Sequence, residues 1–126
     1  METPSRNDIF TDTARMDFHA LVKELNENVG ATVVQTMAGV KDRTSPYKWA
    51  KPDGPMPGAD VEARVRLGYR VWRTLSQYEG PNVALAWLMG ANPRLNEDLP
   101  VLYIQRQLSR EVLGAAEAFV SDTYAA

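Results

Sequence analysis

The side chains of this 126-residue chain that could catalyse reactions or bind metals form no recognisable catalytic or metal-binding motif. His19 is the single histidine, cysteine is absent, and the carboxylates Glu97 and Asp98 are adjacent in an expected loop. Thiol catalysis, zinc–thiolate sites and disulfides are therefore excluded. Adjacent carboxylates usually cap a helix or face solvent and do not form an acid–base couple. We expect no catalytic activity, no metal site and no cofactor.

Polar residues between positions 43 and 51 are instead of the types that bind nucleic acid. Arg and Lys can hydrogen-bond guanine edges or phosphates, and Ser and Thr suit phosphates. Lys51, just beyond the others, could hold the DNA backbone. The candidate DNA-binding residues are Arg43, Thr44, Ser45, Tyr47, Lys48 and Lys51.

Charge is unevenly distributed along the chain, whose formal net charge is −2. Residues 41–73 hold eight Lys and Arg against four Asp and Glu, a net charge of +4, whereas the segments on either side are each −3. A basic middle between acidic ends suggests one face for a polyanion and another face for a different partner. The alternative is a solvated basic surface without a partner.

Apolar periodicity predicts an all-α chain of about seven helices, because no alternating strand pattern persists. Asp17 is expected to cap a helix over Phe18–Val29 that Gly30 ends, and Gly39 to stop a second helix over Ala31–Ala38. Further helices are expected over Pro46–Ala50, over Asp60–Tyr78, after a break at Gly80-Pro81, over Leu99–Leu108, and after a cap at Ser109.

The expected organisation has three parts. Residues 1–16 contain few apolar positions and are expected to form a flexible N-terminal arm. Residues 17–79 are expected to form a helix-turn-helix-like domain, and residues 80–126 a separate C-terminal unit.

Two short helices joined by a glycine turn are typical of helix-turn-helix units, whose second helix enters the major groove. Two positions depart from that pattern. If Gly39 is the turn glycine, Gln35 lies where the helices pack closest and a small residue is usual. Lys48 then lies where an apolar residue is expected, with Trp49 one position later. The alternative is a helical hairpin with an incidental basic surface.

The segment Ala84–Phe119 (ALAWLMGANPRLNEDLPVLYIQRQLSREVLGAAEAF) carries a spaced pattern: Trp87-Leu88, Asn92-Pro93, Leu95, Pro100 and Val112. With this pattern it resembles the toxin-binding domain of the Xre–MbcA–ParS antitoxin family. The helix-turn-helix-like segment resembles that family's N-terminal unit, and the resemblance covers about residues 18–120. One departure is the turn between the last two helices, which usually contains glycine and here reads Arg106-Gln107-Leu108-Ser109.

The resemblance implies an antitoxin of a type II toxin–antitoxin pair. The usual partner is a RES-domain toxin, which depletes NAD by cleaving it. In such families the C-terminal domain packs on the toxin, the last residues can block its NAD cleft, and the N-terminal domain binds the operon's own promoter. Trp87 is expected in the core. The candidate toxin-binding residues are Asn92, Pro93, Leu95, Tyr103, Arg106, Ser121, Asp122, Thr123, Tyr124, Ala125 and Ala126.

The expected partners are thus a cognate toxin and operator DNA, with a homodimer or a larger toxin–antitoxin assembly. No apolar run is long enough to span a membrane, which takes about 18–20 residues, and the N-terminus lacks an apolar signal core, so we expect a cytoplasmic protein. Two alternatives remain open: a stand-alone transcription regulator whose C-terminal half dimerises, and a helical domain that binds a small molecule.

Overall fold

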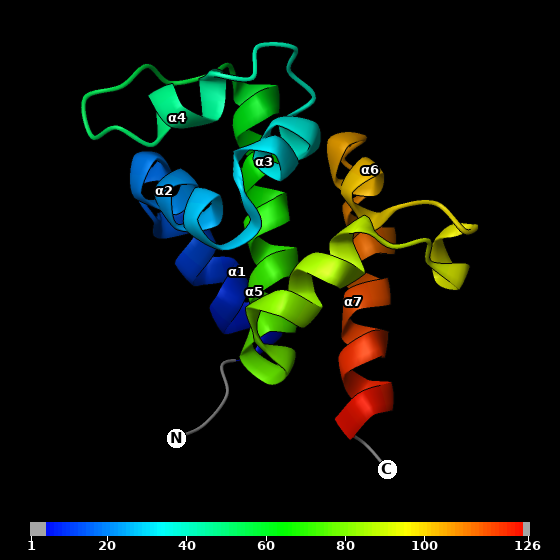
Figure 1. Ribbon diagram of the computed structural model, residues 1–126. Helices are drawn as coiled ribbons and strands as arrows, with labels where there is room; N and C mark the ends of the chain where they lie inside the picture. Colours follow the sequence, from blue (N-terminus) through cyan, green and yellow to red (C-terminus); the bar gives the residue numbers. More distant parts are fainter. Residues whose placement is uncertain (1–4, 125–126) are drawn as a thin grey trace.

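The computed structural model describes residues 5–124, except for the side chains of residues 123 and 124, and this part is all-helical (Figure 1). The all-α class predicted from the sequence is therefore confirmed for the described residues. The number of α-helices in this part of the chain agrees with the prediction only because one helix, over residues 6–15, was not predicted, while two predicted helices form one element over residues 59–89. The elements are α1 (Arg6–Arg15), α2 (Phe18–Val29), α3 (Ala31–Ala38), α4 (Ser45–Trp49), α5 (Ala59–Met89), the 3-10 helix η1 (Pro93–Leu95), α6 (Pro100–Gln105) and α7 (Ser109–Tyr124).

Local signals set the ends of α2 and α3 as predicted. The Asp17 carboxylate accepts a hydrogen bond from the Ala20 amide at 3.1 Å and so caps α2. Gly30 and Gly39 have φ values of 91° and 71°, which favour glycine because a Cβ atom would crowd the backbone. Helix α6 is shorter than predicted, because the chain turns at Arg106.

Helix α5 is the central element, and five helices pack around it: α1, α2, α3, α6 and α7 (Figure 1). Helix α4 packs on α2 and α3. It bends where the sequence predicts a break. Gly80 has a φ of 81°, and Pro81 has no amide hydrogen to donate to the helix ladder. The second half of α5 consequently leaves the direction of the first half and leads to the loop that contains η1.

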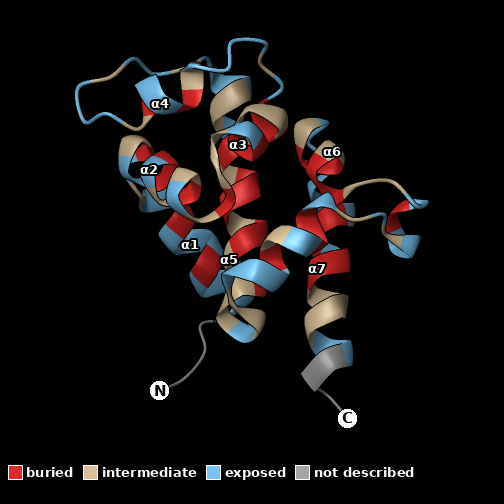
Figure 2. Cartoon of the chain, in the orientation of Figure 1, coloured by how far each residue is buried: buried red, intermediate tan, exposed pale blue. Residues whose placement is uncertain are grey.

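Buried residues occur in both halves of α5, before and after the bend (Figure 2). They form one hydrophobic cluster that extends from Phe18 in α2 to Ala116 in α7. Gly68 allows α3 to approach α5 closely, since a Cβ atom there would lie 2.3 Å from the Met37 sulfur. The Gln105 side chain of α6 donates to the Thr36 carbonyl of α3 at 2.8 Å. The core therefore continues from the helices before Gly80 to those after it.

Helix α1 occupies residues 6–15 of the segment 1–16, for which the sequence predicted a flexible arm. Ser5 and Asp8 form a reciprocal capping box at its start, and Ile9 and Thr13 are buried. Arg66 of α5 donates from Nη1 to the carbonyls of Thr13 and Met16 at 2.8 and 2.9 Å. These bonds satisfy carbonyls that the end of α1 leaves free, so α5 stabilises a helix whose own apolar pattern is weak.

Within residues 5–124, no helix combines the length and the apolar composition needed to cross a bilayer.

Candidate nucleic-acid and protein interfaces

The inner side of α4 is anchored to α2. Trp49 is buried and meets the Phe18 ring edge-on, with centroids 6.2 Å apart. The Asn26 side chain donates to the Pro46 carbonyl at 3.0 Å, and His19 Nδ1 lies 2.7 Å from the Trp49 carbonyl oxygen. The sole histidine is thus engaged in holding α4. These contacts fix which side of α4 faces outward.

Of the predicted DNA-binding residues, α4 carries Ser45, Tyr47 and Lys48, and the segments on either side of it carry Arg43, Thr44 and Lys51. Tyr47 is 62% exposed, and only Ser45 of the six is half-buried. We use the name α4 surface for the exposed residues of this region that can donate hydrogen bonds or carry positive charge, namely Lys41, Arg43, Thr44, Tyr47, Lys48 and Lys51.

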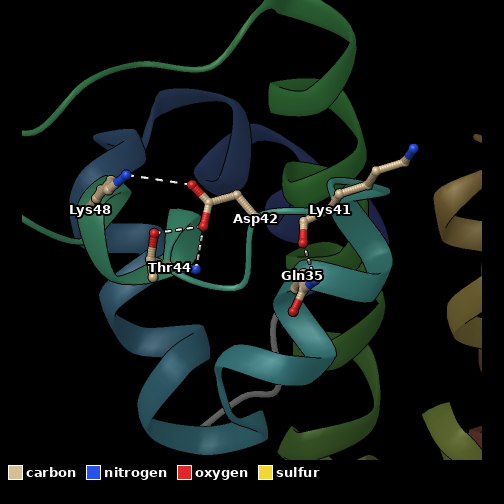
Figure 3. A network of polar contacts seen from close by, with 5 residues as sticks. All are labelled: Gln35, Lys41, Asp42, Thr44 and Lys48. Carbon is tan, nitrogen blue, oxygen red and sulfur yellow. Dashed lines mark hydrogen bonds and ion pairs between the residues drawn. The ribbon is translucent and has the colours of Figure 1, made fainter.

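The turn before α4 is held by two residues that the sequence analysis did not select (Figure 3). Asp42 Oδ1 accepts from the Thr44 amide at 2.8 Å and from the Thr44 hydroxyl at 2.6 Å. Gln35 Nε2 donates to the carbonyls of Val40 and Lys41 at 3.2 and 3.1 Å. The glutamine that departs from the usual helix-turn-helix pattern therefore ties α3 to its own turn.

Asp42 also lies within ion-pair range of the α4 surface. Its Oδ2 is 3.4 Å from Lys48 Nζ (Figure 3). The hydrogen bonds from Thr44, chiefly that from the side chain, lower the pKa of Asp42, with a smaller contribution from Lys48. The carboxylate is therefore charged at neutral pH, and it offsets part of the positive charge of this surface.

The other half of the basic middle segment is used inside the fold. Arg64 donates to the Ala38 carbonyl at 3.1 Å, and Arg66 pairs with Glu62 at 2.8 Å. Arg73 approaches the Asp12 carboxylate at 3.7 Å, and the Arg70 guanidinium stacks on the Phe10 ring at 4.4 Å. The arginines of α5 thus bind α1 and α3, and only the α4 surface retains cations directed to solvent from this segment of the described chain.

A groove of about 240 Å³ lies between the second half of α5, the η1 turn and α7. It brings together predicted residues that are far apart in the sequence: Asn92 and Pro93 line one wall and Asp122 lines the other. The Trp87 and Phe119 rings lie 6.3 Å apart, centroid to centroid. We call this depression the Trp87 groove; its lining is Trp87, Asn92, Pro93, Arg94, Ala115, Phe119 and Asp122.

Asn92 builds the turn that forms this wall. Its side-chain oxygen accepts from the Arg94 amide at 2.9 Å, and its carbonyl accepts from the amides of Leu95 and Glu97, both at 2.9 Å. Asn96 and Glu97 have positive φ values of 57° and 64°, so the turn reverses tightly. Pro93 fixes φ at the start of η1. The hydrogen bonds of Asn92 and the fixed φ of Pro93 therefore restrict the conformation of this wall.

Two predicted contact residues lie in the core. Leu95 is 1% exposed, and Tyr103 is buried and accepts a hydrogen bond from the Asn96 side chain at 3.3 Å. This differs from the sequence expectation of surface contacts, because η1 packs against α7 and turns the Leu95 side chain inward. The exposed Arg106 pairs with Asp98 at 3.2 Å. Trp87 is buried, as predicted.

The C-terminal tail continues α7. Ser121 and Asp122 are exposed, and residues 123 and 124 are helical. The predicted contacts by Ala125 and Ala126, and by the side chains of Thr123 and Tyr124, lie outside the described residues. In the turn before α7, Gln107 has a φ of 57° and so adopts the left-handed conformation for which glycine is better suited.

Sequence reasoning did not select Arg94 or Phe119 for the Trp87 groove. Phe119 follows Ala115 by four residues, so both lie on one side of α7, and this spacing was the signal that could have placed it. Among the described residues, no group of three or more His, Asp and Glu side chains is arranged to hold a metal ion.

Comparison of the chain with models of protein families, with curated proteins and with solved structures finds no match.

Proposed function

We propose that this protein is an antitoxin of a type II toxin–antitoxin pair that binds its toxin through the Trp87 groove and the C-terminal part of α7. The observation that carries the proposal is the convergence of Asn92, Pro93 and Asp122 on one groove. These residues belong to the segment that resembles the Xre–MbcA–ParS toxin-binding domain. A RES-type toxin that cleaves NAD is the partner that this resemblance implies.

The chemistry of the groove is compatible with a protein partner. Two aromatic side chains and an arginine line it, and these residue types contribute most to protein–protein binding. The Arg94 and Asp122 side chains are exposed at its rim and offer charges of both signs. A toxin segment with an apolar side chain flanked by polar groups would fit these features.

We further propose that the α4 surface binds the promoter of the operon. The α4 helix follows α3 and a glycine-containing turn, and its outward side presents cations and hydroxyl groups. Such groups bind phosphates and base edges. Autoregulation would then place the DNA interface and the toxin interface on different elements of one chain.

A direct test is co-expression with the product of the adjacent open reading frame. We expect the neighbour alone to arrest growth and the full chain to relieve the arrest. A chain truncated after Phe119 should neutralise less well while it still binds promoter DNA. The proposal fails if the full chain gives no relief, and the role of the tail fails if truncation reduces both properties equally.

A stand-alone regulator with a C-terminal dimerisation unit is the second candidate. It is favoured by the second half of α5, where residues 80–89 contain no charged side chain and Val83 and Met89 are exposed. Sedimentation of Val83→Glu and Met89→Glu variants separates the candidates. If these variants lose both the dimer and DNA binding but still relieve growth arrest by the neighbouring gene product as the parent chain does, the regulator is favoured.

A further inference from the structure

A second cavity lies on another part of the molecule, between α1, the first half of α5 and the start of α7. Its volume is about 270 Å³. It shares no residue with the α4 surface or the Trp87 groove. The lining residues are Phe10, Thr13, Ala14, Ala63, Arg66, Leu67, Arg70, Gln107 and Ser109. Two of these described residues are arginines, and none is a carboxylate.

The Arg66 guanidinium has its own partners. Its Nε pairs with Glu62 at 2.8 Å, and its Nη1 bonds the carbonyls of Thr13 and Met16. These acceptors fix the position of the group, and the Glu62 carboxylate offsets its positive charge. Arg66 is thus a rigid part of the lining.

Arg70 has a different environment. Among the described residues its guanidinium has a ring contact with Phe10, at 4.4 Å, and no hydrogen-bond or ion-pair partner. Arg6, whose charge repels that of Arg70, is itself paired with Glu117 at 3.0 Å. Burial is the main cause that lowers the pKa of Arg70, and repulsion by Arg6 lowers it further. Attraction by Glu117 raises this pKa and so opposes part of the shift. A half-buried guanidinium with five N–H donors and no acceptor is a favourable site for an anion.

The rest of the lining adds apolar and polar contacts. Phe10 is 52% exposed although its ring contacts Arg70, so part of the ring remains open to a ligand. Ala14, Ala63 and Leu67 supply an apolar wall, and Gln107 and Ser109 supply polar groups at the opposite side. Ligand pockets usually measure about 300–1,000 Å³, so this cavity suits a ligand of about one ring.

We propose that this cavity binds a small organic anion composed of one flat apolar group and one carboxylate or phosphate group. The anion pairs with Arg70, and the apolar group lies against Phe10 and the alanines. Because the cavity joins α1, α5 and α7, an occupant would stabilise the packing of these three helices on one another. The inference does not depend on the antitoxin function.

The test is a titration of the ¹⁵N-labelled full chain, followed through backbone amide shifts. Phenyl phosphate and benzoate serve as probes and distinguish the two anionic groups. Benzyl alcohol and inorganic phosphate supply the ring and the anion alone. We expect saturable shifts at Ala14, Ala63 and Gln107–Glu111 with at least one organic anion, and at least tenfold weaker binding of benzyl alcohol and inorganic phosphate.

Two variants and a control test the assignment. Arg70→Gln should weaken binding at least tenfold, and Ala63→Leu should do the same by filling the cavity without altering Arg70. Arg94→Gln removes a guanidinium from another site and should leave the affinity unchanged. The proposal is overturned if neither organic anion gives saturable shifts at the cavity. It is also overturned if Ala63→Leu binds like the parent chain, or if Arg94→Gln weakens binding as much as Arg70→Gln does.

Discussion

Arg94 in the η1 turn and Asp122 in α7 approach within 3.9 Å across the Trp87 groove. Their side chains are 61% and 73% exposed. An exposed pair of this kind contributes little to folding, about 0–1 kcal/mol, because water screens it. Its position at the rim of the groove makes it a means of recognising a partner, and it can be altered without disturbing the core.

Charge reversal at Arg94 should therefore separate binding from stability. We expect Arg94→Glu to weaken the affinity for the toxin by roughly tenfold, about 1.4 kcal/mol, since it places two like charges at the rim. The free energy of unfolding should change by less than about 0.5 kcal/mol. Isothermal titration calorimetry and urea unfolding measure the two quantities.

The matched control is Arg110→Glu, which reverses an exposed charge at the other end of α7. It should leave toxin affinity unchanged. Equal weakening by Arg94→Glu and Arg110→Glu would show that only the net charge matters and would remove the groove from the interface.

Asp42 should limit the affinity of the α4 surface for DNA. Asp42→Asn keeps an oxygen that can accept from the Thr44 amide, but it removes the negative charge beside Lys48. We expect tighter DNA binding, by roughly threefold to tenfold, and a steeper dependence on salt, because one more cation is free to displace counterions. Fluorescence anisotropy of a promoter fragment at several salt concentrations measures both.

Three further variants and a control, Lys23→Ala, complete that experiment. Asp42→Ala loses the acceptor for Thr44 and should bind DNA less tightly than Asp42→Asn. Lys48→Ala and Arg43→Ala should weaken binding and flatten the salt dependence, whereas Lys23→Ala, an exposed lysine on α2, should do neither. If Lys48→Ala and Arg43→Ala both bind like the parent chain, α4 is not the recognition helix.

Leu95 should contribute to stability. Truncating a fully buried leucine costs about 2–5 kcal/mol through lost burial and the cavity that remains. We expect Leu95→Ala to lower the free energy of unfolding by that amount, and Leu95→Asp to lower it further because a charge would be buried. Leu108→Ala, at a partly exposed position, should cost much less. A stability of Leu95→Asp equal to that of the parent chain would contradict the placement of η1.

Tyr69 should make the fold sensitive to alkali. Its hydroxyl donates to a Glu24 carboxylate oxygen at 2.8 Å, and burial, followed by Glu24, raises the pKa of Tyr69 well above 10. The stabilising contribution of the neutral phenol is complete below pH 10, the ordinary pKa of an unfolded tyrosine, and is lost progressively at higher pH. Thermal unfolding should show this decline above pH 10. Tyr69→Phe should reduce the loss of stability above pH 10, and Tyr47→Phe should not. Equal losses in the parent chain and both variants would contradict the role of Tyr69.

The ends of α2 and α3 could be predicted from the sequence because Asp17, Gly30 and Gly39 act on their immediate neighbours. Helix α1 could not be predicted from its apolar pattern, because contacts with arginines of α5 some 50 residues later stabilise it. The Ser5–Asp8 capping box was the local signal for it.

For the candidate sites too, features set by neighbouring residues could be predicted from the sequence, and features set by distant helices could not. The types and spacing of residues 43–51 predicted a basic surface, and these residues lie together because the segment is short. The burial of Leu95 depends on α7, and the Trp87 groove depends on how α7 crosses the end of α5. The internal use of the α5 arginines likewise depends on where α1 packs, so the charge count alone overstated the cationic surface.

Hydrogen–deuterium exchange of the chain with and without the adjacent gene's product tests the proposed toxin interface most directly. If the proposal is correct, a stable complex forms, and new protection concentrates in residues 87–98 and 112–122, while α4 exchanges as in the free chain. Absence of a complex, or protection confined to other helices, would contradict it.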